Sequence, residues 1–497
     1  MIDQHLPILQ IIIPLIAAPF CVMLRSGAAA WLLAATASWL AVGNSWLLLQ
    51  KVMQQGVVVY ELGGWEPPYG IEYRVDSLNG LVIFLISCIS AIVITYAKVS
   101  VDKEVREHRQ SLFYTAWLLC ITGLLGIAIT GDAFNVFVFL EISSLSTYAL
   151  VALGGDRRAL TAAYRYLVMG TIGATFILIG IGLMYMQTGT LNMADLADRL
   201  HRVHPGLANN HTINAAFAFL TVGISLKLAL FPLHRWLPNA YTFAPSAVSA
   251  FLAATATKVS LYLLLRFSFT IFGIEFAFAT MGLDLILMVL SLFAICFASL
   301  LAVYKVNVKR MLAYSSVAQI GYMTLGISFG TVAGISAGIL HMFNHALMKG
   351  CLFMALGCVF YRIGSVQIDK FSGLAKRMPL TMAAFVVGGL SIIGIPLTAG
   401  FISKWYLISA ALEQGKWAVA IVVLAGSLIA AVYIWKVVEK AYFGEPLEEH
   451  AGVLDAPPAM LIPMYVLVFA NLYFGVQASL PAGVAEQAAK LLIRGGP

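Results

Sequence analysis

Charged side chains inside long apolar stretches are the residues of this sequence whose chemistry is most informative. Glu141 lies in the middle of NVFVFLEISSLSTYAL, and Lys227, Lys258 and Lys404 each lie within a separate apolar stretch. A lysine at the centre of a membrane helix costs roughly 2.5–3.5 kcal/mol on insertion scales, so chains do not usually keep one for packing. We therefore expect these four side chains to have a function inside the bilayer.

A histidine pair and a further lysine share one helix face. His341, His345 and Lys349 follow one another at i, i+4 and i+8 in HMFNHALMKG, so they line the same side of a helix. Three interpretations of the histidines are open, namely a metal-binding pair, satisfied core residues, or members of a proton relay. The sequence offers no third ligand nearby, which disfavours the metal.

Together these groups have the composition of a proton path. One carboxylate cannot neutralise several ammonium groups by direct contact, so some of the lysines must be neutral or hydrated. Burial favours the neutral form of an ionisable group, so it raises the pKa of a glutamate and lowers that of a lysine. The two pKa values then approach a common range in which protons can be exchanged. A static Glu141–Lys227 ion pair is the structural alternative, although buried pairs are poor stabilisers. Lys258 and Lys404 lie too far from helix ends to reach the interface easily.

Two proline-containing breaks lie beside two of the lysines. Pro232 follows Lys227 by five residues and cannot donate a backbone hydrogen bond, so the helix should end or break there. Pro396, in GIPLTAGFISKW, precedes Lys404. Backbone groups freed at membrane depth need protein or water around them, so the breaks predict hydrated pockets. They also form a weak internal repeat of the kind that marks translocation sites in inverted-repeat transporters.

The helices that must position these groups account for most of the chain. Its 497 residues are 61% hydrophobic and 11% charged, with a mean hydropathy of +0.90, and apolar runs of spanning length recur from end to end. This composition predicts an all-α polytopic membrane protein with about 14 transmembrane helices, two of them broken. The expected spans lie near 6–24, 28–50, 76–98, 112–130, 133–153, 161–187, 212–232, 245–268, 279–303, 308–329, 333–361, 380–412, 416–440 and 458–478.

The basic residues indicate how these spans are oriented. Most of the 30 lysines and arginines fall in loops on one side, which the positive-inside rule makes cytoplasmic, and both termini then face the outer side. On the cytoplasmic side we place Lys309 in a short loop and interpret KVSVDKEVREHR (98–109) as a solvated loop. The first apolar stretch has no small-residue cleavage pattern, so we expect a retained helix of a multi-pass protein of the inner (cytoplasmic) membrane.

The sequence lacks the motifs that redox, nucleotide-binding and nucleic-acid-binding proteins require. The six cysteines all lie in apolar stretches and form no Cys-x-x-Cys or iron–sulfur spacing. The sequence contains no P-loop or Rossmann fingerprint, and its net charge of +7 reflects the basic loops and not nucleic-acid binding. We expect no cofactor, no metal and no catalytic residue on this chain.

Six stretches carry a resemblance to a known family: TGDAFNVFVFLEISSLSTYAL (130–150), AAYRYLVMGTIGA (162–174), KLALFPLHRWLPNAYTFAPSAVSAFLAATATKVSLY (227–262), VKRMLAYSSVAQIGYM (308–323), HMFNHALMKGCLF (341–353) and GIPLTAGFISKWYL (394–407). Over about 110–410, the chain resembles the proton-translocating antiporter-like subunits shared by respiratory complex I, membrane-bound hydrogenases and Mrp-type cation/proton antiporters. GDAFNVFVFLE and the chain length make it most similar to the D subunit of Mrp antiporters. Complex I subunits with a long lateral C-terminal helix are a poorer match.

The resemblance implies roles for the matching positions. Glu141 and Lys227 would form the coupling pair of a first half-channel. Lys258 would be the central relay, with His341 and His345 nearby, and Lys404 would exchange protons with the far side.

Three further residues are expected to modulate this path, namely Arg165, His234 and Lys349. Arg165 stands where the family pattern leads us to expect lysine, and arginine does not release its proton, so it would tune Glu141 or anchor its helix. The family fold implies N-terminal helices 1–3 (1–111), two inverted five-helix repeats (112–268 and 279–440), and a last helix with a tail (441–497).

These expectations define a transporter subunit and not an enzyme in itself. The first function is a proton-translocating subunit of a multisubunit Na⁺ or K⁺/proton antiporter, working in the bilayer beside other hydrophobic subunits. The alternative is the proton-pumping subunit of a complex I-type NADH dehydrogenase or a membrane-bound hydrogenase, with the redox chemistry on other chains. A stand-alone channel is a third interpretation. The sequence does not distinguish the antiporter interpretation from the redox-driven one, because both use the same row of lysine and glutamate residues.

Overall fold

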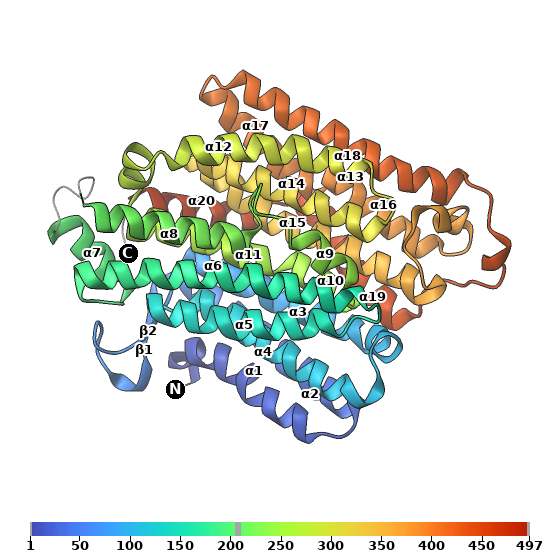
Figure 1. Ribbon diagram of the computed structural model, residues 1–497, viewed down its shortest axis with the longest axis horizontal. Helices are drawn as coiled ribbons and strands as arrows, with labels where there is room; N and C mark the ends of the chain where they lie inside the picture. The colour runs from blue at the N-terminus through green and yellow to red at the C-terminus, as the bar shows by residue number, and fades with distance from the viewer. Residues whose placement is uncertain (1, 204–209, 495–497) are drawn as a thin grey trace.

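Long apolar helices run back and forth along the longest dimension of the molecule, a computed structural model that describes residues 2–203 and 210–494 (Figure 1). In lipid every backbone group must be hydrogen-bonded within the segment, which apolar stretches of this length achieve as helices. The helices are α1 (Leu6–Met23), α2 (Gly27–Gln55), α3 (Ser77–Glu104), α4 (Gln110–Ile129), α5 (Ala133–Ala152), α6 (Arg158–Thr188), α7 (Met193–Val203), α8 (His211–Leu228), α9 (Leu237–Phe243), α10 (Ser246–Ala254), α11 (Ala256–Leu265), α12 (Leu283–Phe293), α13 (Ser299–Val303), α14 (Val308–Ser328), α15 (Val332–Ile363), α16 (Pro379–Ile393), α17 (Ala399–Glu413), α18 (Trp417–Phe443), α19 (Pro458–Val476) and α20 (Ser479–Arg494).

The predicted fold class, an all-α polytopic membrane protein, is confirmed. Within the described residues, 12 helices or helical runs are long and apolar enough to cross a membrane. α14 falls outside this set because its serines, tyrosines and Gln319 make it more polar, and α16 and α17 because each is short. Adding α14 and the α16–α17 pair gives the fourteen spans that the sequence predicts.

Both expected breaks are present, and each lies close to its lysine. α8 ends at Leu228, one residue after Lys227, and Ala229 takes a left-handed backbone conformation with φ 59°. The chain resumes as a helix only at α9. In the second half, α16 and α17 are separated by a short turn in which Leu397 has φ 70°.

A third interruption was not predicted from the sequence. Thr255 leaves the helical conformation (φ −125°, ψ −57°) and separates α10 from α11, three residues before Lys258. α11 then continues as a π-helical turn, Arg266–Ile271. The sequence has no proline here, so the expected single span 245–268 carried no visible signal for the break.

Two glycines bring α6 against α8. A Cβ added to Gly223 would lie 2.7 Å from the carbonyl oxygen of Gly173, and one added to Gly173 would lie 3.6 Å from Cγ of Lys227. Larger residues would therefore push the two helices apart. The close approach packs the first part of the Lys227 side chain against Gly173 of α6.

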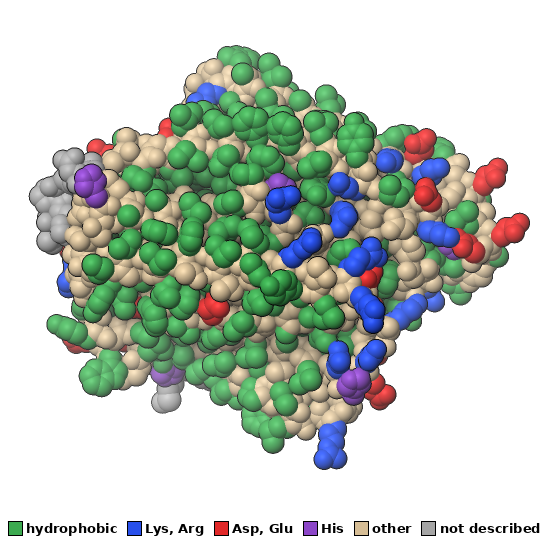
Figure 2. Space-filling view, viewed as in Figure 1, with side chains coloured by type: hydrophobic (Ala, Val, Ile, Leu, Met, Phe, Trp, Pro, Cys, Tyr) green, Lys and Arg blue, Asp and Glu red, His purple; other side chains and the backbone are tan. Residues whose placement is uncertain are grey.

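The two ends of the bundle differ in charge. Lysines and arginines gather at the right-hand end of the face shown in Figure 2, whereas both termini lie toward the opposite end (Figure 1). Near the termini the 51–75 connection forms an antiparallel hairpin of β1 (Val58–Glu61) and β2 (Glu72–Val75), with Val58 opposite Val75.

The C-terminal region differs from the expected tail. The segment after α19 forms α20, which packs against α15 and α3. One face of α20 is buried and its charged residues are exposed, so an amphipathic pattern accounts for the helix; the buried residues are Pro481, Val484, Ala485, Ala488, Ala489 and Leu492. Residues 495–497 of the expected tail lie outside the described part of the chain.

A buried ion pair joins α3 to the end of α11. Arg266 Nη2 lies 2.7 Å from Oδ2 of Asp76, and the side chains are 11% and 12% exposed. Asp76 also accepts the backbone N–H groups of Leu78 and Asn79, so it caps α3 as well.

Arg266→Met is expected to lower the free energy of unfolding by about 3–5 kcal/mol, since it leaves the Asp76 carboxylate buried without its counter-charge. Thermal unfolding of the detergent-solubilised protein measures the effect. Lys490→Met is the control, because its partner Glu486 is exposed and such surface pairs contribute about 0–1 kcal/mol. Equal shifts for the two variants would contradict a special role for the Asp76–Arg266 pair.

Candidate functional site

The first cluster of charged groups lies between α5 and α8. Lys227 Nζ donates a hydrogen bond of 2.8 Å to Oγ of Ser144, which follows Glu141 by one turn of α5. The charge of Glu141 acts on Lys227, but the two side chains make no ion pair within 4.0 Å. The pair is therefore electrostatically coupled without direct contact, and a small bridging group is needed to pass a proton between them.

Aromatic side chains hold the break that follows Lys227. The indole of Trp236 donates a 2.9 Å hydrogen bond to the carbonyl of Leu226 in the last turn of α8, which also accepts the N–H of Ala229 at 3.3 Å. The ring of Tyr166 stacks on Trp236 with centroids 4.0 Å apart, and Tyr148 meets Tyr166 edge-on at 4.7 Å. These contacts support the helix end at which Lys227 lies.

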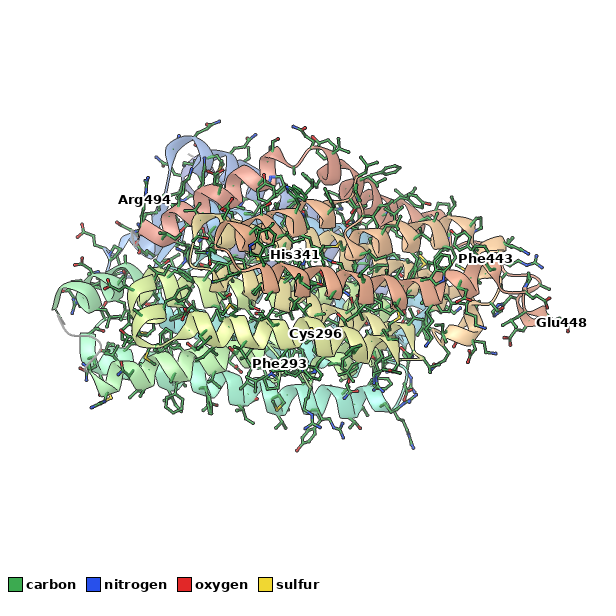
Figure 3. The ribbon with its side chains drawn as sticks, turned by 90° about the horizontal axis from the view of Figure 1, so that it is seen from above. Phe293, Cys296, His341, Phe443, Glu448 and Arg494 are labelled. Carbon is green, nitrogen blue, oxygen red and sulfur yellow. The ribbon has the colours of Figure 1, made fainter. Side chains whose placement is uncertain are left out.

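The second cluster is centred on His341 of α15. Its Nδ1 lies 2.8 Å from Oγ of Ser403 on α17, and its Nε2 lies 2.9 Å from Oε1 of Gln319 on α14. His341 is buried midway along the bundle (Figure 3). Both ring nitrogens are thus connected to hydroxyl or amide groups on neighbouring helices, an arrangement suited to proton exchange.

The break between α16 and α17 supplies the site of Lys404. Its Nζ donates to the carbonyls of Ile392 and Ile393 at 2.8 and 3.0 Å, and to Oγ of Ser427 at 2.8 Å. The ammonium also lies 4.7 Å from the centroid of the Tyr322 ring. The end of a helix leaves carbonyls free, and here two of them hold a buried amine.

The third cluster contains Lys258, which is fully buried. Its Nζ donates to the carbonyl of Ala253, which the interruption at Thr255 leaves free. Lys227 and Lys258 therefore lie beside a helix end or interruption, and the amine of Lys404 binds the carbonyls at the end of α16. This shared feature explains how amines are accommodated at these depths without a carboxylate in contact.

Lys349 lies on the same face of α15 as the histidines, as the spacing predicted. Its Nζ donates to the carbonyl of Leu312 at 2.8 Å and to Oγ of Ser315 at 3.0 Å, both on α14. Ser315 in turn lies 2.8 Å from the hydroxyl of Tyr433 on α18. Lys349 was expected only to modulate the path, but the structure places it directly beside the central groups.

The second and third clusters form one continuous group. The charges of Lys404 and Lys258 both act on His341, and those of Lys258 and Lys349 act on His345. The two histidine rings are nearly parallel, with centroids 6.3 Å apart. The structure thus brings five of the sequence-derived residues together in the interior, each within electrostatic range of at least one other, namely Lys258, His341, His345, Lys349 and Lys404. It records no direct interaction of Lys227 with Lys258 among the described residues.

Several buried polar atoms on the helices of these clusters have no hydrogen-bond partner. They are Oε1 of Glu141, both ring nitrogens of His345, Oδ1 of Asn344 and Oγ of Ser336. Most buried polar atoms in proteins are paired with protein or water, and an unpaired one costs about 1–3 kcal/mol. Buried water molecules are the usual partners of such atoms.

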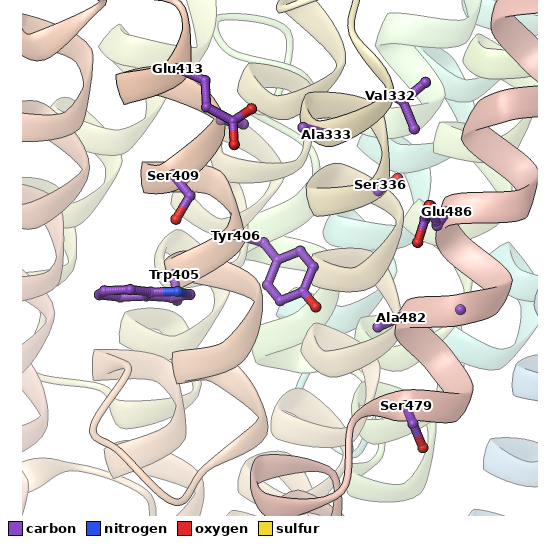
Figure 4. Close-up of a pocket in the computed structure, with 12 residues that line it drawn as sticks. Val332, Ala333, Ser336, Trp405, Tyr406, Ser409, Glu413, Ser479, Ala482 and Glu486 are labelled. Atoms are coloured by element: carbon purple, nitrogen blue, oxygen red, sulfur yellow. The ribbon is translucent and has the colours of Figure 1, made fainter.

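A cavity of about 760 Å³ opens between α15, α17 and α20 (Figure 4). Tyr406 points into it, and the carboxylates of Glu413 and Glu486 lie on opposite walls. Ser336, with its unpartnered hydroxyl, precedes His341 by five residues on α15, an axial rise of about 7.5 Å. The cavity therefore approaches the His341 cluster from the end of the bundle at which the termini lie.

Two of the expected modulating residues lie apart from these clusters. Arg165 is on an exposed face of α6 and makes no hydrogen bond or ion pair with another described residue. His234 lies in the turn between α8 and α9, where its ring stacks on Phe231 with centroids 5.2 Å apart. Their proposed modulating roles remain predictions. No group of three metal-binding side chains occurs in the described ranges, which leaves His341 and His345 without a third ligand there.

Sequence reasoning missed the uncharged partners of the charged groups, namely Ser144, Gln319, Ser403 and Ser427. Ser144, Gln319 and Ser403 lie in stretches that carry the family resemblance, so the resemblance could have pointed to them. A search restricted to charge could not single them out, because serine and glutamine also occur in membrane helices for packing.

The chain has relatives that match over nearly its whole length. Residues 130–430 match the family described as NADH:quinone oxidoreductase/Mrp antiporter, TM. The chain is 41% identical over 478 residues to NADH-quinone oxidoreductase subunit N of Desulforudis audaxviator (strain MP104C), covering 93% of this chain and 94% of that protein. It is 29% identical over 487 residues to the D subunit of the Na(+)/H(+) antiporter of Bacillus subtilis (strain 168), covering 98% and 97%. A chain of the membrane-bound sulfane sulfur reductase, an archaeal respiratory membrane complex, has a TM-score of 0.90 at 32% identity, covering 98% of each chain.

Proposed function

Because this chain belongs to the NADH:quinone oxidoreductase/Mrp antiporter family of transmembrane subunits, we propose that it moves protons across the membrane as one subunit of a multisubunit complex. The path runs from Glu141 and Lys227 through Lys258 and the histidines to Lys404. Protons pass between these groups along water, because the distances between the clusters exceed direct hydrogen bonding.

One observation carries this proposal. Buried amines and imidazoles from α8, α11, α15 and α17 lie in the interior together with buried polar atoms that have no partner. A structural role would favour direct ion pairs or apolar replacements at these positions, since unpaired buried charge destabilises a fold. Ionisable groups linked by water are what successive proton transfers require.

The first candidate for the driving reaction is exchange against Na⁺ or K⁺. The relative from Bacillus subtilis, which is named as part of a Na(+)/H(+) antiporter, supports it. On this interpretation the chain is the proton-conducting partner of other hydrophobic subunits in the bilayer. The basic end of the bundle faces the cytoplasm and both termini face the outer side of the inner (cytoplasmic) membrane.

The second candidate is a redox-driven complex. The relative with 41% identity is named an NADH-quinone oxidoreductase subunit N, and the sulfane sulfur reductase is a respiratory complex. On this interpretation electron transfer on other chains drives the same proton path. The chain contributes no redox centre of its own under either candidate.

Flux measurements on the purified complex, reconstituted into vesicles with an internal pH dye, test the function and its coupling. The antiporter interpretation predicts a pH change when a Na⁺ or K⁺ gradient is applied and none when a reductant is supplied. The redox interpretation predicts the reverse. Vesicles in which neither treatment moves protons would contradict the proposed function.

A further inference from the structure

A second cavity, of about 590 Å³, lies at the basic end of the bundle. Helices α3, α10, α14 and α15 end or begin around it. Charged residues on its wall are Lys103, Glu104, Asp156, Arg158 and Lys309. Neither Glu104 nor Lys309 belongs to the path described above. The sequence predicted a cytoplasmic loop for both residues, and the structure gives each of them different surroundings.

Glu104 is the last residue of α3 and not part of a solvated loop. Its Oε2 accepts the backbone N–H and the hydroxyl of Ser246 at 2.9 and 3.2 Å, and its Oε1 accepts the hydroxyl of Ser100 at 2.6 Å. α10 begins after Pro245, which offers no side-chain cap, so the Glu104 carboxylate caps α10 from another helix. The carboxylate is therefore fixed on the wall of the cavity.

Lys309 is buried with only 3% of its surface exposed, although the sequence placed it in a loop. Its Nζ donates to Oγ of Ser246 at 3.1 Å and to the carbonyl of Ala244 at 3.4 Å. It also lies 5.3 Å from the centroid of the Phe360 ring, and the charge of Glu104 acts on it. Ser246 thus connects a buried amine to a carboxylate.

The cavity is close to the central cluster along α14. The carbonyl that Lys349 binds belongs to Leu312, which follows Lys309 by three residues. Three residues of helix rise about 4.5 Å, so the amine of Lys349 is held about one turn of α14 above Lys309. The charge of Lys258 acts on Lys349 in turn. Ionisable groups therefore extend from the cavity to the middle of the bundle.

We propose that this cavity is the cytoplasmic mouth of the proton path, in which Glu104 collects protons and passes them through water to Lys349. The inference rests on the proposed function and adds a route for uptake. The Glu104 carboxylate takes a proton from a hydronium ion and releases it to water on the inner side, from which the neutral amine of Lys349 takes it up. Release of the proton returns Glu104 to the carboxylate form in which it started, and the charge of Lys309 beside it stabilises that form.

The groups that face Glu104 determine how readily it binds a proton. Lys309 faces it from α14, Ser246 from α10, and Ser100 and Tyr96 from its own helix. Lys103 and Arg158 are the other cations on the cavity wall, and Asp156 is paired with Arg158 at 2.6 Å. The cations on the cavity wall outnumber the carboxylates. A neutral variant of Glu104 therefore removes the carboxylate that binds the proton and leaves the wall more positive.

Glu104→Gln tests the proposal, because glutamine keeps an oxygen that can accept the N–H of Ser246 but cannot exchange a proton. In vesicles of the whole complex with the cytoplasmic face outward, proton uptake is expected to fall about 10-fold. This is less than the 10²–10⁴-fold typical of an essential proton-transfer group, since water can also deliver protons directly. Glu104→Asp is expected to restore at least half of the flux.

Chemical rescue separates proton collection from helix capping. A small mobile buffer such as imidazole on the cytoplasmic side is expected to restore flux to Glu104→Gln, whereas the same buffer inside the vesicles has no effect. Asp102→Asn is the control, because Asp102 lies on the same helix, is paired with Lys98 at 2.6 Å and does not line the cavity. It should keep unmutated flux.

Two results would overturn the inference. Reduced flux in Glu104→Gln that buffer does not restore would assign the carboxylate to capping alone. Full flux in Glu104→Gln would exclude it from uptake, and if Lys258→Met abolishes flux in the same experiment, the proposed function stands without this mouth. Full flux in both variants would instead overturn the proposed function itself.

Discussion

Lys258→Met is expected to reduce proton flux in reconstituted vesicles by at least about 10²-fold, the lower end of the range for a positioned proton-transfer group. Lys258 is fully buried, and its charge acts on His341, His345 and Lys349. No other ionisable group of the described chain is seen to act on all three. Methionine has a similar volume, so the packing around α11 should be kept.

A double variant with Lys404→Met tests whether the two lysines act in series. Lys404 also acts on His341, so a single line through the histidine predicts that the double variant is no more defective than either single one. Lys490→Met, at an exposed lysine of α20, is the matched control and should transport normally. Substantial residual flux in each single variant, lost only in the double, would indicate two parallel routes instead.

Glu141→Gln is expected to produce the second large loss, again about 10²-fold or more in proton flux. Among the described residues, Glu141 is the carboxylate whose charge acts on Lys227, and its unpartnered Oε1 is available for water. Glutamine keeps the size of the side chain but removes both its charge and its ability to carry a proton. Flux is measured in vesicles that contain equal amounts of the assembled complex.

The control for Glu141 is Glu449→Gln, which changes an exposed carboxylate that is paired with Lys370 on the surface. That variant should behave like the unmutated protein. If Glu141→Gln assembles normally and also transports at the unmutated rate, Glu141 does not belong to the path. The hydrogen bond from Lys227 to Ser144 would then be the feature that matters in the first cluster.

The spans and most of the charged site were predictable because both are recorded in short stretches of sequence. Apolar runs of membrane-spanning length have few stable alternatives to helices in lipid, so composition alone predicted the fold class and the number of spans. A lysine or glutamate inside such a run is costly wherever the run packs, which singled out Glu141, Lys227, Lys258 and Lys404. The prolines near Lys227 and Lys404 marked two of the breaks for the same local reason.

The contacts that give these residues their surroundings were decided by the tertiary structure. Ser403 is 62 residues from the histidine it contacts, and Ser144 is 83 residues from Lys227. Thr255 interrupts its helix without a proline. Such pairings depend on which helix faces lie together, and no local pattern records that.

Burial of the charges at the helix ends was likewise outside the reach of the sequence. Glu104 and Lys309 occur in basic segments that resemble any cytoplasmic loop, and hydropathy assigns such segments to solvent. Only the packing of α3, α10 and α14 around one serine shows that both groups are held on the wall of a cavity. A charge is placed in solvent or in the interior by the elements that cover it, and these come from distant parts of the chain.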